Sequence, residues 1–342
     1  MARKIRVIQC GVGAIGTEVM KLALEKQNIK VVAAVDVREQ MVGKDLGEVI
    51  GLGRSVGIKV TNKVGEVFKK VKADVVIATT LSHFEEIFET VREAIEAGKN
   101  VISTCEDAIF PWTRNPGLAQ KIDKLAKRKG VSFLATGINP GFMMDYLPIS
   151  LTSIMRKVDK IIIHRVANMA SCGLVDWELF GYGKSIEAFN EGLAKGKIGG
   201  FIAFRQIMEM VAKALNWGKI DYKEEKMGLV SKSKRAAKCG IVEPGTVHAV
   251  KQIAWGFKGG KEVMTFDEYF IINPDRDEDG MEAGNFITIE GEPSVEVTAT
   301  GEQAFRMALT TAAHVVNSIP ALLNAKPGLL TVDDLPPSPC LP

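Results

Sequence analysis

A glycine motif near the amino terminus constrains the fold of this chain more than any other feature. Gly11-Val-Gly13-Ala-Ile-Gly16 follows a short apolar run, residues 5–9, and precedes a stretch with helical periodicity. The first glycine permits a tight turn, the second lets the backbone approach a pyrophosphate, and the third lets helix and strand pack closely. Asp36 ends the next apolar run, at the distance where an acid accepts hydrogen bonds from a ribose. Together these features indicate a dinucleotide-binding βαβ unit.

The first 140 residues alternate short apolar runs with longer amphipathic segments, the pattern of a parallel sheet with helices on both faces. The predicted strands are residues 5–9, 30–37, 57–60, 73–79, 100–103 and 131–135. The predicted helices are residues 15–26, 64–71, 82–97 and 115–129. Ser82 and Asn115 are suitable N-cap residues, and Gly98 and Gly130 stand where a helix end favours positive φ. The sequence therefore predicts an α/β, Rossmann-type, doubly wound parallel sheet.

Beyond residue 140 the pattern becomes that of a second, α+β domain. Its predicted elements are a strand at 160–168, helices at 186–194 and 202–215, and the strands of a mainly antiparallel sheet between 246 and 298. A glycine-rich loop around Trp177 and Tyr182 joins the first of these elements to the next.

The end of the chain is predicted to return to the first domain. A helix at 302–318 precedes Pro320 and a proline-rich tail, for which we expect no regular element. A chain of 342 residues suits about two domains. We predict a dinucleotide-binding domain at 1–140, completed by 301–342, and a substrate-binding domain at 141–300.

Charge and composition exclude several classes of partner. Lys and Arg total 44 against 41 Asp and Glu, so the net charge of +3 favours neither nucleic acid nor an anionic membrane. The four histidines and five cysteines lack the spacing of metal ligands, and we expect no metal. No apolar run suits a signal peptide or a bilayer span. Isolated thiols indicate a reducing compartment, so we predict a cytoplasmic protein.

Asp36 and Arg38 bear on which dinucleotide binds. A carboxylate at Asp36 repels a 2′-phosphate and favours NAD, whereas the guanidinium of Arg38 can offset that charge and bind the phosphate of NADP. A solvated surface arginine is an equally good account of Arg38. We expect NAD as the first choice, with NADP tolerated.

Further contacts to the dinucleotide are predicted at the carboxyl ends of the strands, where open α/β sheets bind their ligands. The residues expected to contact it are Gly11, Gly13, Ala14, Ile15, Gly16, Asp36, Arg38, Thr79, Thr80, Ser103, Cys105 and Asn139. Asn139 could satisfy the nicotinamide carboxamide or hold the turn before Pro140. Cys105 is better explained as a small packed residue than as a nucleophile paired with a histidine.

Glu106 is the candidate catalytic residue. It follows the apolar strand 100–103, where the nicotinamide should face the second domain. A carboxylate in that position can accept a proton or attract a cationic substrate. The structural alternative is an ion pair with a lysine or arginine at the domain edge.

The sequence around Glu106 and beyond it resembles a known family, the 2,4-diaminopentanoate dehydrogenases and the related NAD(P)-dependent native amine dehydrogenases. The resemblance runs through nearly the whole chain and rests on residues 6–16, 103–107, 137–142, 180–183, 314–320, 326–331 and 334–336. Two other dehydrogenase families match less well. The segment Cys105-Glu106-Asp107 lacks the lysine of the Glu-Lys-Pro motif of sugar dehydrogenases, and the paired histidines of dihydrodipicolinate reductase are absent.

The resemblance implies oxidative deamination of 2,4-diaminopentanoate at C4 during ornithine breakdown, giving 2-amino-4-oxopentanoate, ammonia and NAD(P)H, with reductive amination of ketones as the reverse reaction. It also implies a homodimer built on the 141–300 domain, with a last helix that returns to the nucleotide domain. An amine must lose a proton before hydride leaves, because the nitrogen lone pair stabilises the developing cation. Glu106 is suited to take protons from nitrogen and from water.

Eight residues are candidates for the substrate pocket. They are Phe142, Met144, Asp145, Arg165, Asn168, Met169, Trp177 and Tyr182. Arg165 or Asn168 would meet the substrate carboxylate, and Asp145 its ammonium. Core packing or a salt bridge competes with ligand contact at each position, and for Asp145 so does a charge placed for a helix dipole. Two other functions stay open: a dehydrogenase for another amine, amino acid or carbonyl compound, and a non-catalytic NAD(P)-binding protein.

Overall fold

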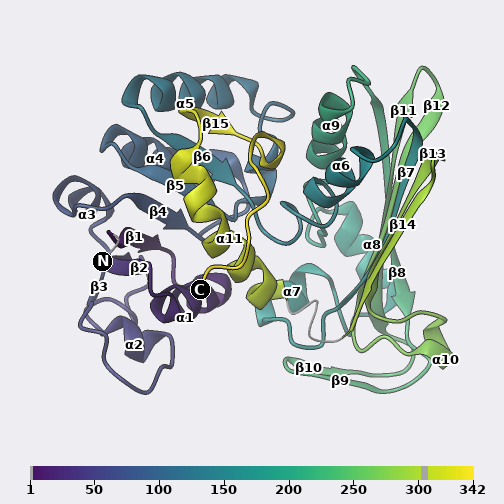
Figure 1. The fold of residues 1–342 in the computed structure, drawn as a ribbon. Coiled ribbons are helices and arrows are strands. Elements are labelled where there is room, and N and C mark those ends of the chain that lie inside the picture. The colour runs from purple at the N-terminus through teal and green to yellow at the C-terminus, as the bar shows by residue number, and fades with distance from the viewer. Residues whose placement is uncertain (1–2, 302–306) are drawn as a thin grey trace. The chain divides into compact units, whose positions relative to one another are not determined.

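The computed structural model describes residues 3–301 and 307–342 (Figure 1). Contacts divide the chain into two compact units, Met1–Tyr146 with Met307–Pro342, and Leu147–Arg306. The first unit therefore combines the two ends of the chain. None of the helices within the described residues is both long and apolar enough to cross a membrane.

In the described part of the first unit, seven strands form a parallel sheet in the order β15-β6-β5-β4-β1-β2-β3. The strands are β1 Ile5–Cys10, β2 Ile29–Val35, β3 Val60–Thr61, β4 Val75–Ala78, β5 Asn100–Ser103, β6 Ser132–Ala135 and β15 Gly328–Leu330. Strand order reverses between β1 and β4, and open α/β sheets bind ligands outside the carboxyl ends of the strands at such a point.

Helices cover both faces of this parallel sheet. They are α1 Ala14–Glu25, α2 Leu46–Val49, α3 Val64–Lys70, α4 Phe84–Glu96, α5 Pro116–Lys129 and α11 Met307–Asn324, with short 3-10 turns η1 Glu106–Ile109 and η3 Val332–Asp334. Helix α1 packs beside α11, whereas α3, α4 and α5 lie together in another layer (Figure 1). In α4 the buried residues are Phe84, Ile87, Val91, Ala94 and Ile95. Their helical spacing forms one apolar stripe, which joins the buried strand residues in the core.

In the described part of the second unit, six strands form a mixed sheet in the order β14-β13-β7-β12-β11-β8. The strands are β7 Lys157–Asn168, β8 Asp221–Val230, β11 Val247–Lys258, β12 Lys261–Ile271, β13 Gly284–Glu292 and β14 Val295–Thr300, and β9 Arg235–Ala237 pairs separately with β10 Gly240–Val242. Neighbours are antiparallel except β7 and β12, which are parallel. The helices are α6 Tyr146–Thr152, α7 Leu174–Leu179, α8 Ile186–Ala194, α9 Phe204–Ala214 and α10 Arg276–Asp279. Helices α8 and α9 lie along one face of the mixed sheet (Figure 1).

The predicted fold class is confirmed: a Rossmann-like parallel sheet with helices, and a second, mostly antiparallel sheet. Predicted strands and helices of the first 140 residues appear with ends shifted by a few residues. The strand expected at 57–60 is only Val60–Thr61, and the short elements α2 and η1 were not predicted.

The prediction for the end of the chain was wrong in two respects. Helix α11 continues through Pro320 to Asn324, and Gly328–Leu330 forms β15 beside β6. Proline inside a helix costs about 3 kcal/mol, but Ile319 and Leu322 on either side of it are fully buried. Their burial outweighs that cost. The predicted start of the helix, residues 302–306, lies outside the described residues.

Candidate active site

The turn between β1 and α1 has the packing that the glycine motif predicts. Gly11 has φ +87°, a conformation that side chains disfavour. A Cβ at Gly16 would lie 2.1 Å from the carbonyl oxygen of Gly11 and 2.6 Å from the hydroxyl oxygen of Thr79. Only glycine at position 16 therefore lets α1 pack this closely on the turn.

Gly13 differs from its neighbours because nothing packs against it. It is the N-cap of α1, with φ −72°, and a Cβ there would meet no atom within 4 Å. The structure of the protein itself therefore does not require glycine at this position. A pyrophosphate at the start of α1 does require it, since the backbone must approach the phosphates and the amides of Ala14 and Ile15 belong to the first helical turn. The turn thus fits a dinucleotide.

Asp36 lies at the end of β2, beside this turn, and is 6% exposed. It accepts hydrogen bonds from the Val12 amide at 2.7 Å and from the Arg38 side chain at 2.6 and 2.8 Å. Although burial raises the pKa of Asp36, these hydrogen bonds outweigh it and lower the pKa to about 2. The carboxylate is ionised at neutral pH and can accept hydrogen bonds from ribose hydroxyls. Arg38 is bound to Asp36 with its side chain 40% exposed, so both accounts of this arginine stay open.

The hydroxyls predicted near the nicotinamide have structural partners. Thr79 donates to the carbonyl oxygen of Gly11 at 2.8 Å, and Ser103 donates to that of Ala78 at 3.0 Å. Thr80 is exposed and lies over Gly11. Both loops lie at the carboxyl ends of β4 and β5, and their contact with a dinucleotide stays a prediction.

Glu106 begins η1, directly after β5, and is partly exposed. The hydroxyl oxygen of Ser82 is 3.5 Å from its Oε1. The neighbouring thiol of Cys105 is buried and donates to the carbonyl oxygen of Ser82 at 3.2 Å. Burial, together with the nearby Asp107, raises the pKa of Cys105 well above its ordinary value, so the thiol stays protonated. Of the two neighbouring side chains, Glu106 is the one that is partly exposed, and its catalytic role stays a prediction.

The loop that follows β6 contains a buried carboxylate, Asp145, which binds the backbone of that loop. Asp145 is fully buried and accepts the amides of Gly141 at 2.7 Å and Tyr146 at 2.6 Å. Burial raises the pKa of Asp145 to about 6. Because both oxygens bind backbone amides, this side chain shapes the loop that carries Asn139. Met144 is buried in the same loop.

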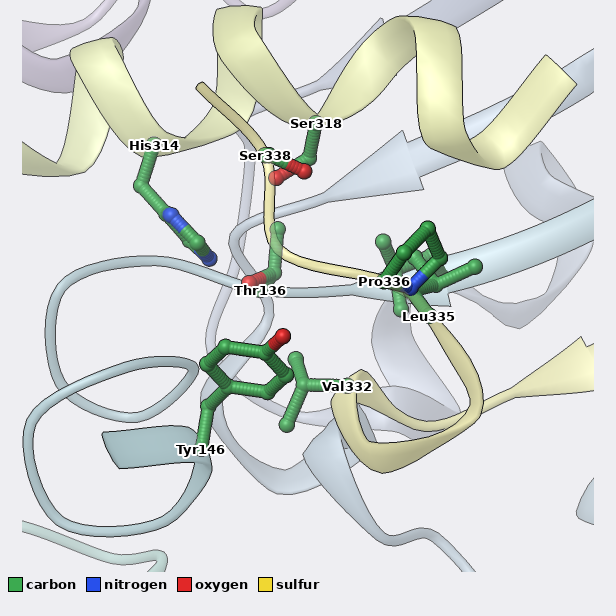
Figure 2. A pocket seen from close by; sticks show the side chains of 9 residues that line it. Thr136, Tyr146, His314, Ser318, Val332, Leu335, Pro336 and Ser338 are labelled. Carbon is green, nitrogen blue, oxygen red and sulfur yellow. The ribbon is translucent and has the colours of Figure 1, made fainter. Parts of the chain in front are cut away.

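Helix α11 contributes polar groups to a small cavity behind this loop, and sequence reasoning did not consider it. His314, Thr136, Tyr146 and the tail residue Pro336 are among the residues that line a cavity of about 10 Å³. Figure 2 shows the first three of these side chains directed into it. Burial lowers the pKa of His314 to about 4, against a hydrogen bond to Gly141, so the ring is neutral at pH 7. His314 also lies 5.2 Å from the ring of Phe142, measured between ring centroids. No motif marks Thr136 or Tyr146 in the sequence.

The remaining pocket candidates, which are Arg165, Asn168, Met169, Trp177 and Tyr182, belong to the second unit. Arg165 is 3% exposed and forms an ion pair with the fully buried Glu268 inside the mixed sheet. Arg165 therefore forms the salt bridge that was the alternative to contact with the substrate carboxylate. The side chain of Asn168 lies within hydrogen-bond reach of that of Asn273 at 3.4 Å, and Met169 is buried.

Trp177 and Tyr182 are both buried in the second unit. Their ring centroids are 5.5 Å apart, and the Tyr182 hydroxyl donates to the carbonyl oxygen of Phe270 at 3.0 Å. Burial raises the pKa of Tyr182 well above its ordinary value. Their contact with a substrate stays a prediction.

Known proteins and family models match this chain over nearly its whole length. Residues 142–341 match the family model of the 2,4-diaminopentanoate dehydrogenase C-terminal domain, and residues 5–105 match that of the dihydrodipicolinate reductase N-terminus. The chain is 32% identical over 335 residues to 2,4-diaminopentanoate dehydrogenase of Acetoanaerobium sticklandii, covering 97% of this chain and 94% of that one. It is 24% identical over 358 residues to an amine dehydrogenase of Streptomyces virginiae, covering 98% of each.

Solved structures show the same fold. Amine dehydrogenase from Mycobacterium smegmatis superimposes with a TM-score of 0.83 at 24% identity, covering 98% of this chain and 97% of that one. GenD2 from gentamicin A biosynthesis, solved in complex with NAD, superimposes with a TM-score of 0.59 at 14% identity, covering 98% and 90%.

Proposed function

Because the chain belongs to the 2,4-diaminopentanoate dehydrogenase family of amine dehydrogenases, we propose that it oxidises 2,4-diaminopentanoate at C4. The products are 2-amino-4-oxopentanoate, ammonia and NAD(P)H, with reductive amination of ketones as the reverse reaction. The observation that carries the proposal is the position of Glu106 at the carboxyl end of β5, on the sheet edge that also carries the glycine turn and Asp36. This chemistry suits a step of ornithine breakdown in the cytoplasm, and all five cysteines are free thiols.

The roles of the chain's own groups follow from the chemistry of an amine. Bound NAD(P)⁺ supplies the hydride acceptor. Glu106 attracts the substrate ammonium and takes a proton from its nitrogen, which frees the lone pair that expels hydride from C4. After this proton passes to solvent, the ionised carboxylate stabilises the iminium and takes a proton from the attacking water. When Glu106 returns that proton to the substrate nitrogen, ammonia leaves and the ketone forms as the hydroxyl proton passes to solvent. Ser82, whose hydroxyl oxygen is 3.5 Å from Oε1, holds the carboxylate.

We propose NAD as the preferred dinucleotide. The buried, ionised Asp36 offers acceptors to ribose hydroxyls and repels a 2′-phosphate. Arg38 is 40% exposed in its side chain and can turn from Asp36 toward such a phosphate, which accounts for tolerance of NADP. The test is kcat/KM with each dinucleotide. Asp36→Ala should shift the ratio toward NADP, and an unchanged ratio would remove Asp36 from cofactor selection.

The substrate assignment is tested by a spectrophotometric screen. NAD(P)H should form with 2,4-diaminopentanoate and not with aspartate, homoserine or simple alkyl amines. A preference for one of those other amines would refute the substrate and leave the amine dehydrogenase assignment intact. Glu106→Gln should lower kcat by about 10²–10⁴ because it cannot accept a proton, with little change in NADH affinity. Near-normal turnover in this variant would refute the catalytic role.

We propose that the protein is a homodimer that pairs through the open face of the mixed sheet. Strand register places Ile162, Ile253, Trp255 and Phe286 on one face, where each is only partly buried. Partly exposed aromatic and aliphatic side chains grouped in this way favour a protein partner. Trp255→Glu should give a monomer in light scattering. The exposed Ile154 lies elsewhere in the second unit, and Ile154→Glu serves as the control that leaves the mass unchanged. A wild-type monomer would refute the proposal.

A further inference from the structure

Asp107 is a buried carboxylate that the proposed chemistry does not use. It follows Glu106 in η1 and is 2% exposed. Its Oδ1 accepts the amide hydrogen of Phe84, the first residue of α4, at 2.5 Å. His83, the N-cap of α4, makes no side-chain cap hydrogen bond of its own. A side chain from the loop after β5 therefore caps the helix that follows β4.

The backbone on both sides of Glu106 is tied to the same loop. The amide of Asp107 donates to the carbonyl oxygen of Ser82 at 3.1 Å, and the Cys105 thiol donates to the same oxygen at 3.2 Å. The hydroxyl of Ser82 faces Glu106 itself. Glu106 thus lies between two residues that are both bound to the Ser82 carbonyl oxygen.

Two side chains, those of His83 and Arg114, cover Asp107 from the solvent side. His83 Nδ1 and Arg114 Nη1 lie 3.4 and 3.7 Å from its Oδ2, and both of these side chains are about half exposed, at 45% and 47%. Burial raises the pKa of Asp107, while the Phe84 amide and His83 lower it. The carboxylate therefore has partners for both oxygens, and Oδ1 caps α4 by accepting the amide hydrogen of Phe84.

We propose that Asp107 is a positioning residue for Glu106: by capping α4 it holds η1 against the loop after β4 and so fixes the direction of the Glu106 carboxylate. The inference rests on the proposed role of Glu106. A misplacement of about 1 Å can cost on the order of 10²-fold in rate, so loss of this anchor has a measurable effect.

The central experiment compares Asp107→Ala with Asp107→Asn at saturating 2,4-diaminopentanoate and dinucleotide. The alanine variant loses the acceptor for the Phe84 amide, and kcat should fall by about 10–100-fold. The asparagine variant keeps an acceptor oxygen and should retain kcat within about threefold. NADH affinity, measured by fluorescence titration, should stay within about twofold in both, because the glycine turn and Asp36 are untouched. A soluble, folded asparagine variant that loses more than tenfold would overturn the capping account, including when the alanine variant fails to fold.

A double mutant separates positioning from general structural damage. If Asp107 acts through Glu106, the variant Glu106→Gln/Asp107→Ala should turn over no more slowly than Glu106→Gln alone. If Asp107 has only a structural role, the two losses should multiply. Multiplying losses would refute the inference.

Asp74 provides a matched control. It lies just before β4, at the opposite end of the strand, and accepts the Arg6 amide at 2.8 Å together with the Arg6 guanidinium. Asp74→Ala removes a comparable carboxylate from the same unit and should leave kcat within about twofold while lowering the melting temperature. Normal turnover in Asp107→Ala alongside an inactive Glu106→Gln refutes this inference alone, whereas an active Glu106→Gln refutes the proposed function.

Discussion

The glycine turn offers a prediction in which two substitutions affect different properties: Gly16→Ala should lower stability, and Gly13→Ala should lower NADH affinity. In Gly16→Ala the new methyl carbon would lie 2.1 Å from the Gly11 carbonyl oxygen, whereas ordinary contact begins at 3.4 Å. Backbone must therefore move by more than an ångström, and overpacking of this kind costs about 1–3 kcal/mol or more. In Gly13→Ala the methyl group meets no atom within 4 Å. Its unfolding free energy should stay within about 1 kcal/mol of wild type.

For Gly13→Ala, the effect should appear in NADH binding and not in stability. The methyl group of Gly13→Ala lies where the pyrophosphate must approach the backbone, so NADH affinity should fall about tenfold or more, which corresponds to about 1.4 kcal/mol. Urea denaturation of the ligand-free protein measures the first quantity, and fluorescence titration with NADH measures the second. The expected result for Gly13→Ala is a protein of normal stability that binds poorly.

Gly117 provides the control, because it lies in the first turn of α5 with nothing within 4 Å of a Cβ. Gly117→Ala should gain about 0.5–1 kcal/mol of stability and bind NADH normally. Two results would refute the reasoning: wild-type NADH affinity in Gly13→Ala, or a stability loss there as large as in Gly16→Ala.

Three further predictions concern buried charges. Hydrogen bonds from Arg38 and neighbouring amides outweigh burial and hold the pKa of Asp36 at about 2. The ionised Asp36 therefore contributes its full stabilisation of the folded state above the unfolded pKa of 3.8. This contribution, on the order of 1–2 kcal/mol, should be lost as the pH falls to about 2. Asp36→Asn should lack this loss in urea titrations at each pH. Burial raises the pKa of Asp145 to about 6, so its contribution to stability should decrease as the pH rises from about 4 to 6, and Asp145→Asn should remove that slope. Arg165→Met should cost about 3–5 kcal/mol because Glu268 is left charged and buried, and adding Glu268→Leu should recover most of it in denaturant titrations; a fully stable single variant would contradict the ion pair.

Features that depend on neighbouring residues could be predicted from the sequence, whereas contacts between distant segments could not. Gly98 and Gly130 have φ of 71° and 69°, as their places after helices predict, because glycine conformation depends on a few neighbouring residues. Pro320 was taken to end its helix because the packing of the residues around it cannot be read from local signals. The role of Asp107 was also invisible, since its hydrogen-bond partner Phe84 lies on another helix and no spacing rule joins them.

The edge position of β15 has a consequence for how the chain folds during synthesis. Strand β6 has four consecutive buried residues, and its outer edge pairs with β15, which is translated only after the entire second unit. While the nascent chain lengthens, that edge has no partner from its own sheet, and unpaired apolar strand edges promote aggregation. Synthesis of the second unit must therefore precede closure of the first. A stop codon or a bulky fusion before residue 328 should reduce soluble yield more than its small loss of sequence would indicate.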